Sequence, residues 1–420
     1  MLTTVAFRYL GLSVQFIILS IIAHSVSAED YGLYIISLSI TFSCYYFVGL
    51  GTSESALFRI SRSLALQEKD AVSETIGSVL IITLSCAALI LAVAFSILYK
   101  YAENTSIIFA LILIAATGII FNVSQIFLSL GKSLVGSFLF YPAINITLLL
   151  SSVPTAIILE DPQFSQIALA SSVGAGLSAI SALIFCLWAS RTYSLSWSLE
   201  RAWQLIREGF GLTIVRVLHA GSFWIPTIVT GFMLSPTSAG LMGTAGRLAI
   251  AVSAIIAALR FIIRPTIAIA LAQNNLAYLR TMSGSVAFIS TTGAIFAIII
   301  NAVLGEYLID LLFGSQLGAV SDILTILLIS VFAEALFGPV DEILKVSGRQ
   351  KTVFCIYGIG VSSFFVGCII ASSHGLIWIA WLQVIYVLGI FSAMNISVKR
   401  TLGFFILPRW PDFQTLWKLK

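Results

Sequence analysis

The stretch RTYSLSWSLERAWQLIREG at residues 191–209 is the longest polar break in the middle of the chain. Its apolar residues recur at helical spacing, and charged residues such as Glu200, Arg201 and Arg207 fall on the opposite side. The apolar residues are Leu195, Leu199, Ala202, Trp203, Ile206 and the following Phe210. This pattern predicts an amphipathic helix that joins two long apolar parts of the chain.

Those two parts give the whole chain an unusual composition. Of the 420 residues, 59% are hydrophobic and only 10% are charged, and the mean hydropathy is +1.06. Soluble domains carry about 25% charged and roughly 45–50% apolar residues. The composition therefore predicts an integral membrane protein and excludes a soluble fold, a disordered chain and a nucleic-acid binder. All five cysteines lie in apolar runs without metal-ligand spacing, so we expect neither disulfides nor a metal site.

The apolar parts divide into about twelve segments that are long enough to cross a bilayer, which takes about 20 residues as a helix. They lie approximately at 5–26, 33–57, 74–98, 106–130, 134–159, 166–189, 210–232, 239–263, 282–304, 321–343, 353–371 and 376–397. The predicted fold is an all-α polytopic membrane protein of about 12 transmembrane helices in two six-helix lobes with pseudo-two-fold symmetry. The short breaks between spans exclude an inserted soluble domain.

The predicted organisation has four parts. Residues 1–190 form an N-terminal lobe, 191–209 a cytoplasmic amphipathic linker helix, 210–398 a C-terminal lobe, and 399–420 a cytoplasmic interfacial tail. Faint similarity between 27–34 (SAEDYGLY) and 235–242 (SPTSAGLM), each after the first span of its lobe, suggests an internal repeat. Paired halves in one orientation are typical of transporters, whose substrate sites form where the halves meet. The tail directs Trp410, Phe413, Leu416 and Trp417 at the membrane surface.

The basic residues predict the orientation of the chain. Nineteen of the 22 are assigned to breaks on one side, among them Arg260 at the end of the eighth span and Arg264 and Arg280 after it. The opposite breaks hold Lys100 together with acidic residues such as Glu103. Basic residues accumulate in cytoplasmic loops, so we expect both termini to be cytoplasmic. This charge pattern also favours a first span over a cleaved signal peptide ending near residue 28.

Three stretches resemble one known family. Residues 27–62 (SAEDYGLYIISLSITFSCYYFVGLGTSESALFRISR) are similar to the N-terminal signature of the polysaccharide transport family: an acidic loop, Tyr-Gly-Leu-Tyr, a span, Gly-Leu-Gly and a terminal Arg. Residues 311–328 (LLFGSQLGAVSDILTILL) resemble its Leu-Leu-Phe-Gly loop, and 239–248 (AGLMGTAGRL) the start of its eighth span. The chain departs from the usual pattern with Met242 in place of an aromatic residue, and it has no clear Tyr after the Phe-Gly of the 311–328 loop.

The resemblance covers the chain in span count and lobe order. The family contains O-antigen and related lipid-linked oligosaccharide flippases and belongs to the multidrug/oligosaccharidyl-lipid/polysaccharide exporter superfamily. The resemblance implies a flippase that moves a polyprenyl-diphosphate-linked oligosaccharide across the bacterial inner membrane by alternating access. Its substrate would be an O-antigen or another surface polysaccharide repeat unit, and the transport would be coupled to H⁺ or Na⁺. Polymerase and chain-length proteins of the same pathway are implied partners beside membrane lipids, with no cofactor and no nucleic acid.

Among the ionisable residues inside predicted spans, five are candidates for a function: Glu54, Arg216, His219, Arg247 and Glu334. A charge at a helix centre costs at least ~2.5–3.5 kcal/mol on insertion scales, so each is expected to face a polar cavity or a partner. On the functional interpretation, Arg216 and Arg247 line a central cavity and bind the diphosphate, because guanidinium holds phosphate oxygens bidentately. On the alternative interpretation, Arg216 extends to the cytoplasmic surface and Arg247 pairs with Glu334 or Glu54.

The other three groups are candidates for ion coupling or gating. Glu334 precedes Gly338-Pro339, a pair expected to kink the tenth span and free backbone carbonyls. His219 lies three residues after Arg216, hence on the same helix face, and titrates near neutral pH, although a structural role is the alternative. Glu54 is expected to cap the end of the second span with Arg59 in preference to a coupling role.

Two other functions are alternatives to that of a flippase. A multidrug or cation extruder of the same superfamily would be expected to place carboxylates in its cavity, whereas here buried cations at least match buried anions in number. A membrane enzyme, such as a polymerase or glycosyltransferase, would need a large outer loop or a clustered acid/base constellation, and no loop supplies one. We therefore expect a transporter and no enzyme.

Overall fold

The computed structural model describes residues 2–100 and 105–410, with all side chains in these ranges except those of residues 2–5, 215, 219, 220, 261 and 262. Every regular element in this described part is a helix. Ten helices are long and apolar enough to cross a membrane, and the number rises to twelve if each of two bent helix pairs is one span. The predicted all-α, multi-pass membrane fold is thereby confirmed. Four residues that the predictions above name lie outside the described residues: Glu103, Phe413, Leu416 and Trp417.

The chain divides into two compact units, Met1–Ala220 and Gly221–Lys420, which we call the first and second units. The boundary falls inside helix α9 (Leu199–Met233), whose two parts are Leu199–Leu218 and Gly221–Met233. The predicted linker helix and the seventh span therefore belong to one helical element. The apolar spacing of the linker continues into the seventh span, and Gly209 and Gly211 between them do not end the helix.

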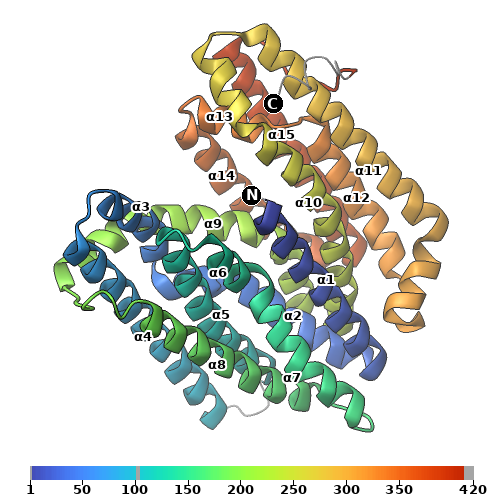
Figure 1. Ribbon diagram of the computed structural model, residues 1–420. Helices are drawn as coiled ribbons and strands as arrows, with labels where there is room; N and C mark the ends of the chain where they lie inside the picture. Colours follow the sequence, from blue (N-terminus) through green and yellow to red (C-terminus); the bar gives the residue numbers. More distant parts are fainter. Residues whose placement is uncertain (1, 101–104, 411–420) are drawn as a thin grey trace. The chain divides into compact units, whose positions relative to one another are not determined.

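The first unit is a bundle around one central helix (Figure 1). Its elements are α1 (Leu2–Ser25), α2 (Ala28–Cys44), the 3-10 turn η1 (Tyr45–Gly49), α3 (Thr52–Ala65), α4 (Lys69–Lys100), α5 (Thr105–Ser129), α6 (Ser133–Phe138), the π-turn η2 (Leu139–Ala143), α7 (Ile144–Ile158), α8 (Phe164–Ala189) and the first part of α9. The central helix is α5, which packs against α2, α3, α4 and α8. Most of its residues are buried, as expected for a helix that is apolar on all sides.

The second predicted span ends earlier than expected. Ser27 caps α2, its Oγ accepting a hydrogen bond from the Asp30 amide at 3.1 Å, and the helix with its 3-10 turn ends at Gly49. Leu50 and Gly51 then take positive φ angles of 47° and 89°, and α3 begins as a separate helix. The predicted span 33–57 is therefore wrong at its end, because the small residues after Gly51 continue the apolar run but belong to the next helix.

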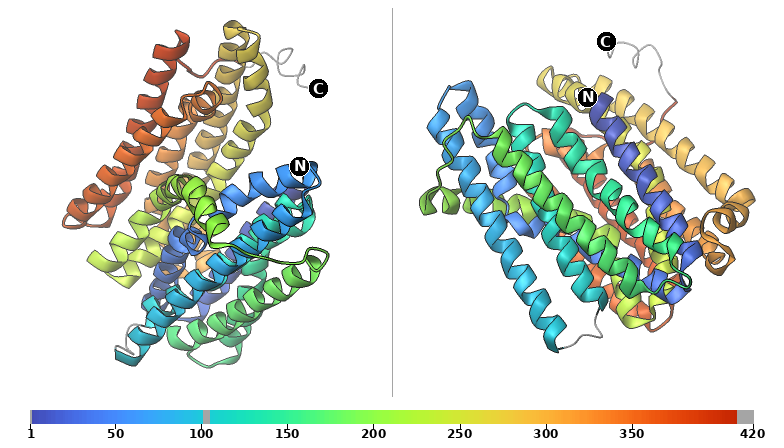
Figure 2. Two further views of the ribbon diagram at one scale, coloured as in Figure 1. Left: turned by 90° about the vertical axis from the view of Figure 1, so that its left-hand side faces the viewer. Right: turned by 60° about the horizontal axis from the view of Figure 1, so that its bottom comes forward.

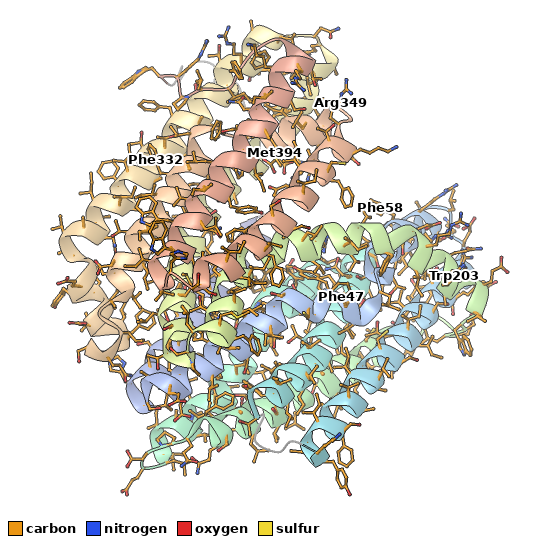
Figure 3. The ribbon with its side chains drawn as sticks, turned by 180° about the vertical axis from the view of Figure 1, so that it is seen from behind. Phe47, Phe58, Trp203, Phe332, Arg349 and Met394 are labelled. Atoms are coloured by element: carbon orange, nitrogen blue, oxygen red, sulfur yellow. The ribbon has the colours of Figure 1, made fainter. Side chains whose placement is uncertain are left out.

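Helix α3 lies against the first part of α9. The Ser55 hydroxyl donates to the Leu205 carbonyl at 2.8 Å, and Arg59 forms an ion pair with Glu208. Figure 3 labels Phe58 of α3 and Trp203 of α9, two side chains that are largely exposed. One face of the predicted amphipathic stretch thus packs on the unit, with Ala202 and Leu205 buried, while Leu199, Trp203 and Phe210 are exposed, as expected for an interfacial helix.

The long helices of the second unit run side by side (Figure 2). Its elements after the second part of α9 are α10 (Pro236–Ala272), α11 (Leu276–Phe313), the 3-10 turn η3 (Ser315–Leu317), α12 (Val320–Leu336), α13 (Val340–Val346), α14 (Gln350–Ser372) and α15 (Leu376–Leu402). A hydrophobic core cluster of this unit joins buried residues of α10, α11, α12, α13, α14 and α15, including Met282, Leu344 and Met394.

A break separates α12 from α13. Gly338 has a φ of 57°, Pro339 follows it, and the two helices are bent by 43°. This confirms the kink that the sequence predicts at Gly338-Pro339. After α15, the chain returns over its own unit: the Asn395 side chain both donates to the Ile406 carbonyl and accepts from the Ile406 amide, each at 2.9 Å. Trp410 contacts Phe288, their ring centroids 5.2 Å apart.

Candidate functional site

An ion pair joins α3 and α9 in the first unit. Arg216 Nη1 lies 2.5 Å from Glu54 Oε1, and the two side chains are 39% and 8% exposed. Glu54 stands in the first turn of α3, not at the end of the second span. The expected pairing of Glu54 with Arg59 is wrong, because Arg59 points to Glu208 instead. Extension of Arg216 to the surface was the alternative interpretation, and its guanidinium is partly exposed while it contacts a buried carboxylate.

Two glycines allow this pair to form. Gly51 and Gly209 place their backbones in direct contact, so that a Cβ on either would overlap backbone atoms of the other helix. Gly51 also has a φ of 89°, which side-chain-bearing residues rarely adopt. Because α3 starts at this contact, Glu54 is held one turn into α3 and faces the segment of α9 that carries Arg216.

Aromatic residues surround the pair. Tyr45 and Tyr46 of η1 stack with ring centroids 4.1 Å apart, and both meet the edge of Phe121. Burial raises the pKa of the Glu54 carboxyl above its usual value, and the nearby Arg216 charge opposes this shift only in part. Glu54 is therefore easier to protonate than an exposed glutamate, although it lies beside a cation.

This arrangement presents one accessible cation beside one buried carboxylate. Glu54 contacts one edge of the Arg216 guanidinium, whose remaining N–H donors are available on its exposed part. With Glu54 ionised, the pair is neutral; with Glu54 protonated, it carries a net positive charge. The site can thus bind an anionic group, and the strength of binding depends on the protonation of Glu54.

A second buried pair lies in the second unit and involves an arginine that the sequence placed in a loop. Arg260 of α10 is buried; its Nη1 donates to Glu334 Oε1 at 2.7 Å and its Nη2 to the Glu334 backbone carbonyl at 2.9 Å. The assignment of Arg260 to the break after the eighth span is wrong, because α10 continues to Ala272. The available signal was the spacing of Arg260 and Arg264, which lie on one helix face and pair with Glu334 and Glu342.

The helix break explains why Arg260 bonds a backbone oxygen. The Gly338 amide donates a hydrogen bond to the Ala335 carbonyl at 3.0 Å in place of the Glu334 carbonyl, and Pro339 has no amide hydrogen. The Glu334 carbonyl therefore lacks its ordinary helical donor, and Arg260 supplies one. The kink at Gly338-Pro339 thus frees the Glu334 carbonyl, as predicted for this pair of residues, and Arg260 of α10 donates a hydrogen bond to it.

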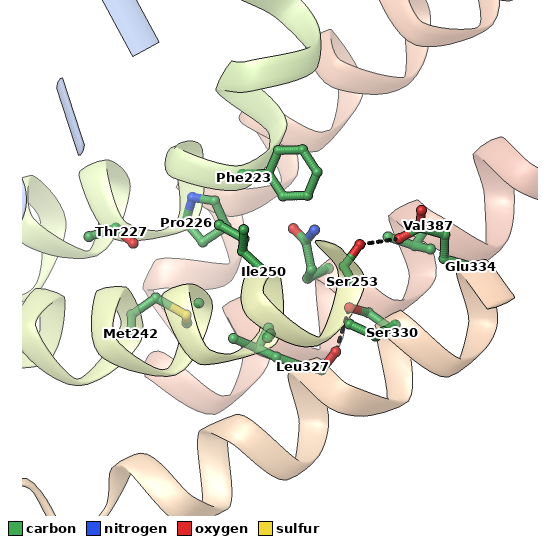
Figure 4. A pocket seen from close by; sticks show the side chains of 14 residues that line it. Phe223, Pro226, Thr227, Met242, Ile250, Ser253, Leu327, Ser330, Glu334 and Val387 are labelled. Atoms are coloured by element: carbon green, nitrogen blue, oxygen red, sulfur yellow. Dashed lines mark hydrogen bonds between the residues drawn. The ribbon is translucent and has the colours of Figure 1, made fainter. Parts of the chain in front are cut away.

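Glu334 also lines a small cavity (Figure 4). Its volume is about 50 Å³, and Ser253, Ser330 and Gln383 contribute polar side chains among apolar ones. The Ser253 hydroxyl donates to Glu334 Oε2 at 3.2 Å, and Gln383 Oε1 is buried without a hydrogen-bond partner among the described residues. The cavity is large enough for ordered water. It is far too small to admit an oligosaccharide.

Arg247 is buried in the second unit and is only 3% exposed. Its guanidinium carbon lies 5.0 Å from the centre of the Trp224 ring, a cation–π distance, and its Nη1 donates to the Gly243 carbonyl at 3.1 Å. The two carboxylates that the alternative interpretation offers to Arg247, Glu334 and Glu54, form ion pairs with Arg260 and Arg216. Arg216 and Arg247 belong to different units. The side chain of His219 lies outside the described residues.

The chain is similar to known proteins in sequence and in structure. A family model described as polysaccharide biosynthesis protein matches residues 2–268. A search of curated proteins finds no significant match. Among solved structures, a multidrug resistance MATE family transporter of the MOP superfamily, in an inward-facing conformation, aligns with a TM-score of 0.72 at 12% identity, covering 93% of this chain and 94% of that one.

Two further structures show the same architecture. The lipid II flippase MurJ, in an inward closed conformation, aligns with a TM-score of 0.69 at 16% identity over 100% of this chain and 89% of that one. The Vibrio cholerae MATE transporter VcmN aligns with a TM-score of 0.54 at 14% identity over 95% and 99% of the two chains. At these identities the likeness shows that the fold is shared with these structures.

Proposed function

The chain belongs to the polysaccharide biosynthesis protein family, and on this premise we propose that it is a flippase for a polyprenyl-diphosphate-linked oligosaccharide. It would carry an O-antigen or similar surface polysaccharide repeat unit across the bacterial inner membrane by alternating access, with both termini cytoplasmic. The observation that carries the proposal is the accessible guanidinium of Arg216 beside the buried Glu54. Polymerase and chain-length proteins of the same pathway would use its product.

Arg216 would bind the diphosphate. Charge-assisted hydrogen bonds to phosphate are among the strongest polar contacts that a protein makes, and arginine keeps its charge at any relevant pH. The exposed part of the side chain gives a ligand access, while Glu54 fixes the orientation of the guanidinium. Arg247 would be a second phosphate ligand in a different state of the transport cycle, because here it is buried against Trp224.

Glu54 would couple transport to protons. Its raised pKa favours the neutral form, which releases Arg216 for an anion, whereas the ionised form competes with the anion for the same guanidinium. Proton uptake and diphosphate binding would thus support each other, and proton loss would favour release. Glu334, with its cavity and its bond to Arg260, is a second candidate for coupling or for a gate, and His219 stays a candidate proton relay.

A multidrug or cation extruder is the alternative, since the MATE transporters share the fold. The charges argue against it. Both carboxylates that the sequence singles out, Glu54 and Glu334, form ion pairs with arginines, and the accessible charge at the first site is a cation. An organic cation would have to displace a covalently attached guanidinium to reach either carboxylate. An anionic substrate meets no such competition.

The experiment that tests the function is a flipping assay in proteoliposomes with a fluorescent lipid-linked oligosaccharide, read by a membrane-impermeant reagent. Arg216→Ala should abolish flipping, and Arg216→Lys should restore it only weakly because lysine lacks the planar fork. Arg207→Ala is the matched control, since Arg207 lies on the same helix and is exposed. Normal flipping by Arg216→Ala, or transport of organic cations by the wild type, would contradict the proposal.

A further inference from the structure

The first unit carries an apolar groove between α1, the α6–α7 segment and α8, with a volume of about 650 Å³. Phe7, Phe138 and Phe185 form part of its wall, and Phe7 meets Phe138 edge to face at 5.8 Å. Phe138 and Phe185 are exposed, so the groove opens outward from the bundle. In a membrane-spanning bundle, such an opening faces the hydrocarbon chains of the surrounding lipid.

Three hydroxyl groups line the groove among apolar side chains, those of Thr147, Ser178 and Ser181, and two of them donate within their own helices. Thr147 Oγ1 donates to the Ala143 carbonyl at 2.9 Å, and Ser181 Oγ donates to the Leu177 carbonyl at 2.8 Å, each within its own helix. These hydroxyls therefore offer little to the many hydroxyl groups of a sugar. The groove is suited to a hydrocarbon chain.

Two cations stand at one end of this groove and are linked to it by a continuous series of aromatic rings. The groove residue Phe185 stacks on Phe127 at 5.2 Å and on Trp188 at 6.0 Å. Lys132 Nζ lies 5.8 Å from the Phe127 ring centre, and the Arg191 guanidinium carbon 5.0 Å from that of Trp188. Lys132 follows the end of α5 and Arg191 follows the end of α8, so both belong to the same edge of the bundle.

Both cations are accessible to a ligand. Lys132 and Arg191 are exposed, and within the described part of the chain neither forms an ion pair. By contrast, Arg59, Arg201 and Arg216 of the same unit each contact a carboxylate. Lys132 and Arg191 therefore present positive charge beside the open end of a hydrocarbon-sized groove.

We propose that this groove binds one anionic phospholipid of the surrounding bilayer, with an acyl chain along Phe138 and Phe185 and the phosphate between Lys132 and Arg191. Basic sites between transmembrane helices on the cytoplasmic side are suited to anionic lipid head groups, and the expected orientation places this edge there. Each buried methylene of the chain adds hydrophobic binding energy, and the two cations add selectivity for a negative head group.

The experiment is native mass spectrometry of the purified full-length protein titrated with phosphatidylglycerol or with phosphatidylcholine of the same acyl chains. The wild type should prefer phosphatidylglycerol. Lys132→Gln combined with Arg191→Gln should weaken phosphatidylglycerol binding roughly 30-fold and leave phosphatidylcholine binding unchanged. Arg62→Gln combined with Lys69→Gln removes the same charge from exposed positions outside the groove and should change neither affinity.

A second pair of variants tests the acyl-chain part of the site. Ser181→Trp fills the groove from an exposed position and should weaken binding of both lipids, whereas Ile184→Trp, on the same helix outside the groove, should not. Equal wild-type affinity for the two lipids would overturn the proposal, as would unchanged phosphatidylglycerol binding in the charge variant. Tighter binding of a polyprenyl diphosphate that Ser181→Trp abolishes would instead assign the groove to the transported lipid.

Discussion

Arg260 donates two hydrogen bonds to Glu334: Nη1 donates to the carboxylate at 2.7 Å, and Nη2 donates to the backbone carbonyl at 2.9 Å. One side chain thus neutralises a buried charge and completes the hydrogen bonding of a broken helix. Removing it would leave both groups unsatisfied in a water-poor interior, and truncation of one partner of a buried pair typically costs about 3–5 kcal/mol.

We therefore expect Arg260→Met to lower the free energy of unfolding by about that amount, measured by chemical denaturation in detergent. Glu334→Gln combined with Arg260→Met should recover part of the loss, because the buried charge is then absent. The outcome that contradicts this account is a double variant no more stable than Arg260→Met alone. Arg280→Met, at a partly exposed position near Phe404, serves as the control.

The second prediction concerns pH. The raised pKa of Glu54 means that folding favours its protonated form, so this carboxyl contributes stability at low pH that is lost as pH rises through its pKa. Protonation also releases Arg216. Binding of a polyprenyl diphosphate should accordingly tighten as pH falls through this range, by at most about tenfold per pH unit for one proton.

Glu54→Gln provides the check on this pH dependence. The amide cannot ionise, so binding measured by microscale thermophoresis should become nearly independent of pH and stay at the tight, low-pH level. If the pH dependence persists in Glu54→Gln, another group titrates, and Glu54 is not the coupling residue.

A third prediction follows from the backbone contact of Gly51 with Gly209. Gly209→Ala places a methyl group where the Gly51 backbone lies, so α3 and α9 must separate. Overpacking of this kind costs typically about 1–3 kcal/mol, and the thermal midpoint and flipping rate should both fall. Gly211→Ala, two residues further along α9 in open space, should be neutral or mildly stabilising. Equal effects of the two changes would show that the contact is unimportant.

A fourth prediction concerns the segment that follows α15. Asn395→Ala removes both bonds to the buried Ile406 backbone and leaves its amide and carbonyl without these partners. The expected cost is about 1–3 kcal/mol for each unsatisfied group. Hydrogen exchange at residues 404–409 should rise strongly. Thr401→Ala, whose hydroxyl bonds only within its own helix, should leave exchange there unchanged.

The sequence predicts the helices well and their partners poorly. Apolar runs of span length are a local signal, so the multi-pass fold and the kink at Gly338-Pro339 follow from composition and proline chemistry. The Glu54–Arg216 pair could not be found in this way, because its residues lie far apart in the chain and meet only when α3 packs against α9. The prediction that Arg260 lies in a loop is wrong. A charged residue near the end of an apolar run ordinarily belongs to the following loop, whereas here α10 continues to Ala272.

The continuity of α9 has a mechanical consequence. Its first part is fastened to α3 and α4 through Ser55, Arg59 and Glu74, and its last residues continue without a loop into the second unit. Arg216 stands about one helical turn before that boundary. The carboxylate that binds Arg216 therefore belongs to the first unit, and this ion pair ties the last turn of α9 before the boundary to α3.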